Sequence, residues 1–171
     1  MNAVPETGGT LSAESYRQID REIAKYPPQQ KRSAVLSALV IAQSELGWLP
    51  AWAIEAVAKY LGMPPIAAYE VATFYAMFDL NPVGRFKLSL CTNLPCALSG
   101  ATRAAAHLKA KLGIEFGETT SDGQFTLKEG ECFGACGDAP VILVNNKRMC
   151  SFLSEDRLDQ LLEQLRRGQG E

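Results

Sequence analysis

The sequence predicts a chain of the α+β or α/β class, with a helical N-terminal part followed by a small α/β part. Three observations lead to this prediction. Apolar residues recur at helical spacing in the first part, the spacing changes to two after Asn81-Pro82-Val83-Gly84, and all five cysteines lie within 91–150. The 171 residues are 47% hydrophobic and 21% charged, a composition that supports packed cores. We expect a flexible N-terminus over 1–11, a four-helix domain over 12–84 and an α/β domain over 85–167.

Prolines and glycines mark the ends of the four helices expected in the first part. The first helix has Tyr16, Ile19 and Ile23 on one face, and Pro27-Pro28 ends it. The remaining boundaries follow the preference for proline at helix starts and glycine just past helix ends. The second helix begins near Pro28 and ends at Gly47, the third begins at Pro50 and ends at Gly62, and the fourth begins at Pro64-Pro65.

The second part has the pattern of a small sheet with two helices. Apolar and polar residues alternate from Phe86 to Leu90, which predicts a half-buried strand that ends at Cys91. A helix over 97–112, a short strand at Phe125 and Leu127, a hairpin of 141–144 with 148–152, and a helix capped by Ser154 complete the expected elements. This order, with a crossover helix and a closing helix, fits a thioredoxin-like α/β layer fold.

Charge and hydropathy exclude several classes of function. Seventeen Lys and Arg against nineteen Asp and Glu give a net charge of −2, which leaves no basic surplus for a phosphate backbone. No uncharged apolar stretch approaches the roughly 18 residues of a membrane span, and the first residues lack a signal-peptide pattern. We therefore expect a cytoplasmic protein without anchor, and we do not expect nucleic acid as a partner.

Four of the five cysteines form two pairs. Four residues separate Cys91 from Cys96, three separate Cys132 from Cys136, and each pair is expected on a loop. If the first two strands are neighbours, both loops meet at one edge of the sheet and bring four thiols together. Zinc and iron-sulfur clusters both use thiolate ligands. The wide spacing favours two irons, each bound by one pair, while structural zinc remains an alternative.

Other interpretations of the cysteines are weaker. Disulfides are disfavoured in a cytosolic chain, and a thioredoxin-type dithiol site has two residues between its cysteines. Cys150 lacks a paired cysteine and is expected to be a packing residue, with a replacement ligand as the second choice.

The surroundings of the pairs indicate electron transfer rather than substrate chemistry. Neither 91–101 nor 129–144 contains Lys or Arg, whereas Glu129, Glu131 and Asp138 are acidic, so we expect a low reduction potential. His107 shares a helix face with Arg103 and Lys111, which places it on a solvated basic stripe. No dinucleotide or phosphate-binding glycine motif occurs, and no catalytic residue is expected.

Several segments resemble one family. The chain resembles, from about Ser12 to Leu165, the small thioredoxin-like iron-sulfur subunits of the NADH-dehydrogenase module of respiratory complex I (NADH:quinone oxidoreductase). The segments are Cys91-Thr92-Asn93-Leu94-Pro95-Cys96, Glu131-Cys132-Phe133-Gly134-Ala135-Cys136-Gly137-Asp138-Ala139-Pro140, Gly47-Trp48-Leu49-Pro50, Gly62-Met63-Pro64-Pro65 and Tyr69-Glu70-Val71-Ala72-Thr73-Phe74-Tyr75. The resemblance favours a cluster over zinc.

The resemblance also implies ligands, partners and location. It implies that Cys91, Cys96, Cys132 and Cys136 hold one 2Fe-2S cluster beside the FMN of a partner flavoprotein that binds FMN and NADH. The chain is then a subunit of an oxidoreductase without its own substrate site, in the peripheral arm on the cytoplasmic side of a membrane-bound complex of the respiratory chain. Corresponding subunits of NAD-linked hydrogenases and formate dehydrogenases are the alternative setting, and a zinc-stabilised adaptor is the alternative from another class.

Overall fold

The computed structural model describes residues 9–168. Positions 1–8, which belong to the stretch 1–11 expected to be flexible, lie outside the described residues. The chain divides into two compact units between Pro82 and Val83, and each is described by itself. Across residues 9–168, every helix is too short or too polar to cross a membrane.

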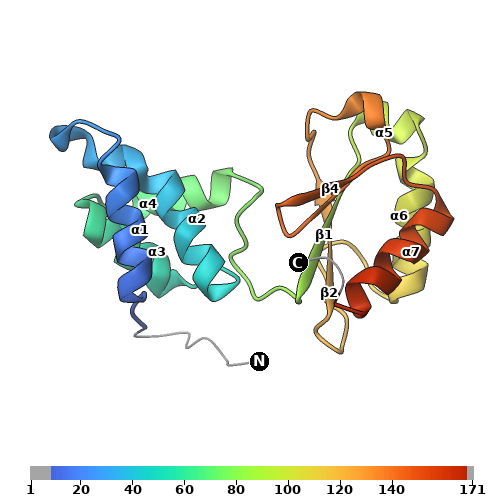
Figure 1. Cartoon of the computed structure of the whole chain (residues 1–171), viewed down its shortest axis with the longest axis horizontal. Coiled ribbons are helices and arrows are strands. Elements are labelled where there is room, and N and C mark those ends of the chain that lie inside the picture. The colour runs from blue at the N-terminus through green and yellow to red at the C-terminus, as the bar shows by residue number, and fades with distance from the viewer. Residues whose placement is uncertain (1–8, 169–171) are drawn as a thin grey trace. The chain divides into compact units, whose positions relative to one another are not determined.

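The first unit consists of helices around one apolar core (Figure 1). They are α1 (Ala13–Ile23), the 3-10 helix η1 (Pro28–Ala34), α2 (Val35–Leu46), α3 (Ala51–Leu61) and α4 (Pro65–Phe74). The sequence predicts that the second helix begins near Pro28, but that segment is 3-10 with a kink at Gln30, and the α-helix starts at Val35. Gly47 and Gly62 end α2 and α3 in the left-handed conformation, as their positions in the sequence predict.

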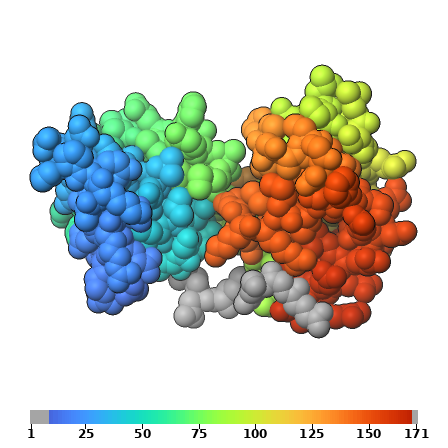
Figure 2. All heavy atoms as spheres, turned by 45° about the horizontal axis from the view of Figure 1, so that its top comes forward, coloured from blue at the N-terminus to red at the C-terminus, as the bar shows by residue number. Residues whose placement is uncertain are grey.

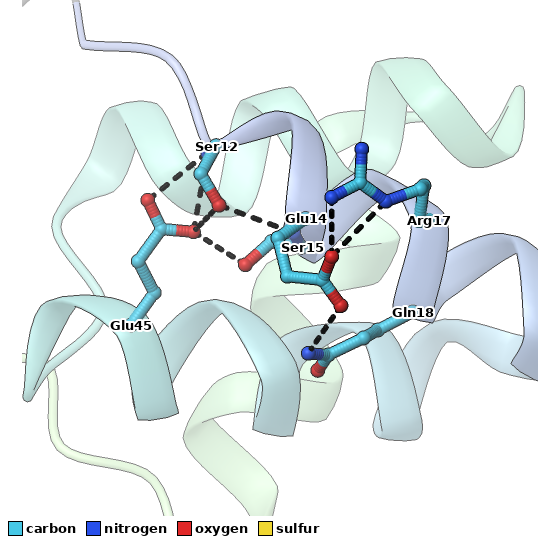
Figure 3. A network of polar contacts seen from close by, with 6 residues as sticks. All are labelled: Ser12, Glu14, Ser15, Arg17, Gln18 and Glu45. Atoms are coloured by element: carbon cyan, nitrogen blue, oxygen red, sulfur yellow. Dashed lines mark hydrogen bonds and ion pairs between the residues drawn. The ribbon is translucent and has the colours of Figure 1, made fainter.

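The start of α1 is held to α2 by a polar network (Figure 3). Ser12 is the N-cap, and its Oγ accepts a hydrogen bond of 3.1 Å from the backbone N–H of Ser15. The Glu45 carboxylate of α2 accepts from Ser12 N at 3.0 Å, from Ser12 Oγ at 3.0 Å and from Ser15 Oγ. These contacts satisfy donors at the helix terminus and join segments that are far apart in the sequence.

The second unit is a four-stranded mixed sheet with helices α6 and α7 on one side (Figure 1). Its elements are β1 (Phe86–Cys91), α5 (Leu94–Leu98), α6 (Ala101–Leu112), β2 (Phe125–Gly130), the 3-10 helix η2 (Cys136–Asp138), β3 (Ile142–Val144), β4 (Arg148–Cys150) and α7 (Glu155–Arg166). The strand order is β2-β1-β3-β4, with β1 parallel to β2 and the other neighbours antiparallel. The crossover from β1 to β2 through α6 is the connection that a parallel pair requires.

The expectation that β1 is half-buried was wrong, because all six of its residues are buried. Leu88 and Leu90 belong to the apolar core that includes α6 and α7. Lys87 and Ser89, the alternating polar residues, are only 3% and 8% exposed. The strand lies between β2 and β3, and this central position decides its burial, which periodicity alone does not reveal.

The helix expected over 97–112 is two helices. α5 ends at Leu98, and α6 begins at Ala101 after Gly100, which has φ 103°. A positive φ interrupts an α-helix and is accessible to glycine at little cost. Cys96 therefore lies in a separate short helix, α5, and not in α6.

The hairpin of β3 and β4 is confirmed. Three residues, Asn145-Asn146-Lys147, connect the strands, and the two asparagines have φ of 50° and 57°, positive values that asparagine tolerates in a tight turn. The Asn145 side-chain oxygen also accepts a hydrogen bond of 2.7 Å from the backbone N–H of Lys87, which ties the turn to β1.

The basic stripe of α6 is not simply solvated, and the sequence prediction is corrected here. His107 Nε2 lies 2.8 Å from Asp159 Oδ1, and Lys111 Nζ donates to Asp159 Oδ2 at 2.8 Å. The His107 side chain is 21% exposed and also faces Glu155. His107 and Lys111 of α6 therefore pair with acidic residues of α7, and these contacts hold α6 against α7.

Candidate metal centre

Cys91 and Cys96 form a buried pair at the carboxyl end of β1. Cys91 is the last residue of the strand, and its backbone N–H donates to Val141 O at 3.1 Å. The chain then turns into α5, where Pro95 occupies the first turn and Cys96 follows within the helix rather than on a loop. Both thiols are 1% exposed. Burial and a hydrogen bond with Cys91 raise the pKa of Cys96 to about 11.

Cys132 and Cys136 form an exposed pair after β2. Their Sγ atoms lie 3.9 Å apart, and Cys136 is the first residue of η2, so only Cys132 lies on the expected loop. Gly134 has φ 74°, and its backbone N–H donates to Cys132 Sγ at 3.4 Å. The hydrogen bond with Cys132 raises the pKa of the Cys136 thiol. The amide contact is of the kind that stabilises a thiolate bound to metal.

The sheet brings the two pairs to one edge. β1 and β2 are parallel and in register from Phe86 with Phe125 to Cys91 with Gly130, so their carboxyl ends lie side by side. Phe133, Ala135 and Ala139 pack against the small apolar cluster that contains the buried cysteines. In Figures 1 and 2 the segments of α5 and η2 lie next to each other at this end of the second unit. The expected meeting of the two cysteine-bearing segments is therefore observed.

The four thiols match the ligand set of a two-iron cluster in type and number. They form two pairs, one buried and one exposed. A structural zinc ion takes four ligands at one point, whereas in a cluster of two irons each iron takes two protein ligands. Four thiols in two adjacent pairs therefore fit a 2Fe-2S cluster.

The structure adds residues that the sequence does not single out. Thr92 Oγ1 donates to Glu129 Oε1 at 2.7 Å, and Asn93 Nδ2 donates to Glu131 Oε2 at 3.1 Å. The sequence marks both glutamates only as acidic neighbours of the cysteines. The register of β1 with β2 is the signal that locates these contacts. It pairs Leu90 with Glu129 and Cys91 with Gly130, so Thr92 and Asn93 follow β1 close to Glu129 and Glu131.

Cys150 is not part of either pair. It lies half-buried in β4, opposite Ile142 in β3, and packs against the core formed with α6 and α7. Burial raises the pKa of this thiol. This environment agrees with the packing role expected from the sequence.

A thioredoxin-like mixed sheet with two cysteine pairs at one end has the ligands of a protein that holds a metal or an iron-sulfur cluster through thiolates. Residues 19–166 match the family described as thioredoxin-like [2Fe-2S] ferredoxin, and the chain belongs to this family.

Relatives and a solved structure agree with the family. The chain is 44% identical over 160 residues to the E subunit of the NADH-quinone oxidoreductase of Rickettsia conorii, with 93% of this chain and 95% of the relative covered. It is 47% identical over 149 residues to the E subunit numbered 2 in the NADH-quinone oxidoreductase of Rhizobium meliloti, with 87% of each covered. An air-oxidised NAD+-reducing [NiFe]-hydrogenase superposes with a TM-score of 0.67 at 27% identity, and the match covers 78% of this chain but 23% of that one.

Proposed function

We propose that the chain is the electron-transfer subunit of an NADH-quinone oxidoreductase and that Cys91, Cys96, Cys132 and Cys136 hold its 2Fe-2S cluster. The observation that carries the proposal is the pair of cysteine pairs at the carboxyl ends of two adjacent parallel strands. The coverage of 95% of the Rickettsia conorii relative at 44% identity supports the same setting for this chain.

The protein residues bind and shield the cluster. When bound, a 2Fe-2S cluster accepts and returns one electron. The buried thiols of Cys91 and Cys96 exclude water from one side, and the backbone N–H of Gly134 donates to Cys132 Sγ. Binding displaces the thiol protons, Cys96 with its raised pKa included. Exposed Glu129 and Glu131 add negative charge nearby, which opposes further negative charge and supports a low reduction potential.

The proposed partner is a flavoprotein subunit that binds FMN and NADH. Exposed apolar side chains flank the cysteines: Leu94 and Leu98 on α5 are 71% and 81% exposed, and Phe152 is 55% exposed. Phe152 is held next to η2, since its backbone N–H donates to Asp138 O at 2.8 Å. An apolar surface of this kind beside acidic residues and exposed thiols favours a partner with apolar and basic residues at its docking face.

A related setting is favoured by one observation. The superposition on an NAD+-reducing hydrogenase supports the equivalent electron-transfer subunit of an NAD-linked hydrogenase as a second candidate. The corresponding subunit of a formate dehydrogenase rests on the sequence resemblance alone. The relatives that match nearly the whole chain are NADH-quinone oxidoreductase subunits, and they favour the first candidate.

The proposal extends to domains and location. Residues 12–84 form a four-helix domain and residues 85–167 a thioredoxin-like domain, a division supported by the boundary between compact units at Pro82 and Val83. The subunit lies in the peripheral arm of its complex, on the cytoplasmic side.

Iron and acid-labile sulfide analysis of the purified chain tests the proposal. Two irons and two sulfides per chain, a brown colour and a paramagnetic signal after reduction are expected of a 2Fe-2S protein. Replacing Cys132→Ser removes or strongly changes this signal, because one thiolate ligand is lost. The matched variant Cys150→Ser keeps the full signal.

Two results contradict the proposal. A colourless wild-type protein with one zinc ion per chain identifies a structural adaptor. Retention of the wild-type spectrum by Cys132→Ser removes Cys132 from the ligands. Co-purification with further subunits of an NADH-quinone oxidoreductase, or with a hydrogenase subunit, then decides between the two electron-transfer settings.

A further inference from the structure

Side chains at and just beyond the carboxyl ends of β1 and β2 join the two cysteine-bearing segments. The Thr92 hydroxyl donates to the Glu129 carboxylate at 2.7 Å, and the Asn93 amide donates to the Glu131 carboxylate at 3.1 Å. The backbone N–H of Thr92 also donates to Gly130 O at 3.2 Å. We call Thr92, Asn93, Glu129 and Glu131 the clasp.

The clasp lies where the strands stop holding the two segments together. The register of β1 with β2 ends at Cys91 and Gly130. Thr92 follows Cys91 directly, and Glu131 precedes Cys132 directly. Glu129 lies within β2, and the other three residues of the clasp follow the two strands. The clasp therefore continues the connection between the segments as far as Thr92 and Glu131, which adjoin Cys91 and Cys132.

The carboxylates of the clasp have two opposing electrostatic effects. A carboxylate is a stronger acceptor than a neutral amide, so it strengthens the hydrogen bonds to Thr92 and Asn93. Its negative charge also repels an anionic thiolate site, and neither 91–101 nor 129–144 contains Lys or Arg to offset it. Replacing either glutamate by glutamine distinguishes the two effects, because glutamine keeps an oxygen that accepts a hydrogen bond but carries no negative charge.

We propose that Thr92, Asn93, Glu129 and Glu131 are positioning residues that hold the Cys91 and Cys132 segments together for cluster binding. The inference rests on the proposed function, since it assigns these residues a role toward the same four thiols. Cluster retention then depends on the hydrogen bonds of the clasp, and the reduction potential depends on its charges.

Variants that remove a donor without changing charge test the hydrogen bonds. Thr92→Val and Asn93→Leu are close to the native side chains in size. Release of iron to an excess of chelator is expected to be about fivefold faster in each, the factor that corresponds to one ordinary hydrogen bond. Thr92→Ser keeps the hydroxyl and restores the wild-type rate. Ser99→Ala is the matched control, because its Oγ donates to Pro95 O at 2.8 Å within one segment, and its release rate stays at wild type.

Variants that remove charge but keep the acceptor test the second part. Glu129→Gln and Glu131→Gln retain an oxygen that accepts from Thr92 or Asn93, so iron release stays within about twofold of wild type. Their reduction potentials rise, because a negative charge near the cluster is gone. Asn93→Leu, which keeps the charge, leaves the potential closer to the wild-type value than Glu131→Gln does. A general loss of structure would change both quantities in every variant. It would not speed iron release in Asn93→Leu and raise the reduction potential in Glu131→Gln separately.

The outcomes separate the clasp from the proposed function. A wild-type chain that holds no iron and no sulfide overturns both. A wild-type chain that holds the cluster, with Thr92→Val and Asn93→Leu releasing iron at the wild-type rate, overturns the clasp alone. If Asn93→Leu does not fold, Asn93→Ala replaces it, and the same comparison of rates applies.

Discussion

Gly130 lies at the point where β2 passes into the exposed cysteine pair, and replacing it by alanine tests how tightly this end of the sheet is packed. A Cβ atom at this position overlaps the Phe133 ring at Cζ and lies 3.1 Å from Leu90 O. Gly130 is buried and pairs with Cys91 in the ladder. The added methyl group therefore has no free space, and the Phe133 ring must move.

Two opposing effects decide the magnitude for Gly130→Ala. Replacing glycine at a φ that alanine tolerates stabilises by about 0.4–1 kcal/mol through the unfolded chain, whereas overpacking costs about 1–3 kcal/mol. The clash outweighs the gain, so we expect a net loss of about 1–2 kcal/mol in the free energy of unfolding. Gly137→Ala is the matched control, because a Cβ there meets nothing within 4 Å and no loss is expected.

Urea unfolding of the full chain, followed by far-UV circular dichroism and by fluorescence, measures the effect. Trp48, Trp52 and all five tyrosines lie before Pro82, so fluorescence reports the first unit and is expected to be unchanged. In a Phe133→Ala background the ring clash is absent, and the cost of Gly130→Ala falls by at least about 1 kcal/mol. Equal stability of Gly130→Ala and wild type, or the same cost with and without Phe133, refutes this account of the packing.

Two further predictions concern α7. Leu158 is fully buried, so Leu158→Ala lowers the free energy of unfolding by about 2–5 kcal/mol. The control Leu98→Ala, at a residue 81% exposed, changes it by no more than about 0.5 kcal/mol. Equal effects of the two substitutions in urea unfolding contradict the core assignment. Hydrogen bonds, first from Lys111 and then from His107, lower the pKa of Asp159 in the folded protein. The ionised Asp159 side chain therefore contributes its full stabilisation above the ordinary carboxyl pKa of about 4. This stabilisation is lost as the pH falls through the lowered pKa of the folded state. The difference in thermal midpoint between wild type and Asp159→Asn therefore shrinks as the pH is lowered below about 4, and a difference independent of pH contradicts the pairing.

Local chemistry explains which parts of the fold were predictable. Gly47 and Gly62 end helices and the Asn145-Asn146 turn closes a hairpin, because these residue types adopt positive φ at low cost. The predictions failed where neighbours decide the outcome. Lys87 and Ser89 alternate with apolar residues like a surface strand, yet both are buried because β1 is central.

The sequence predicted that the two cysteine pairs meet at one edge of the sheet, but it did not predict the environment of the thiols. The spacing of the cysteines marked two pairs near the ends of strands, and the structure places those strand ends side by side. The sequence does not show that Cys91 and Cys96 are buried while Cys132 and Cys136 are exposed. Cys91 ends the central strand β1 and packs with Cys96 in a small apolar cluster, whereas Cys132 and Cys136 lie in an exposed segment after β2.

The sequence by itself determined the kinds of residue available: four thiols in two pairs, no Lys or Arg in 91–101 and 129–144, and glycines that end α2 and α3. These are properties of composition and spacing, and they do not depend on distant contacts. Tertiary structure alone decided which thiols water reaches and which side chains join the two cysteine-bearing segments. Thr92 and Glu129 are separated by 37 positions in the chain, and only the parallel pairing of β1 with β2 brings them within hydrogen-bonding distance.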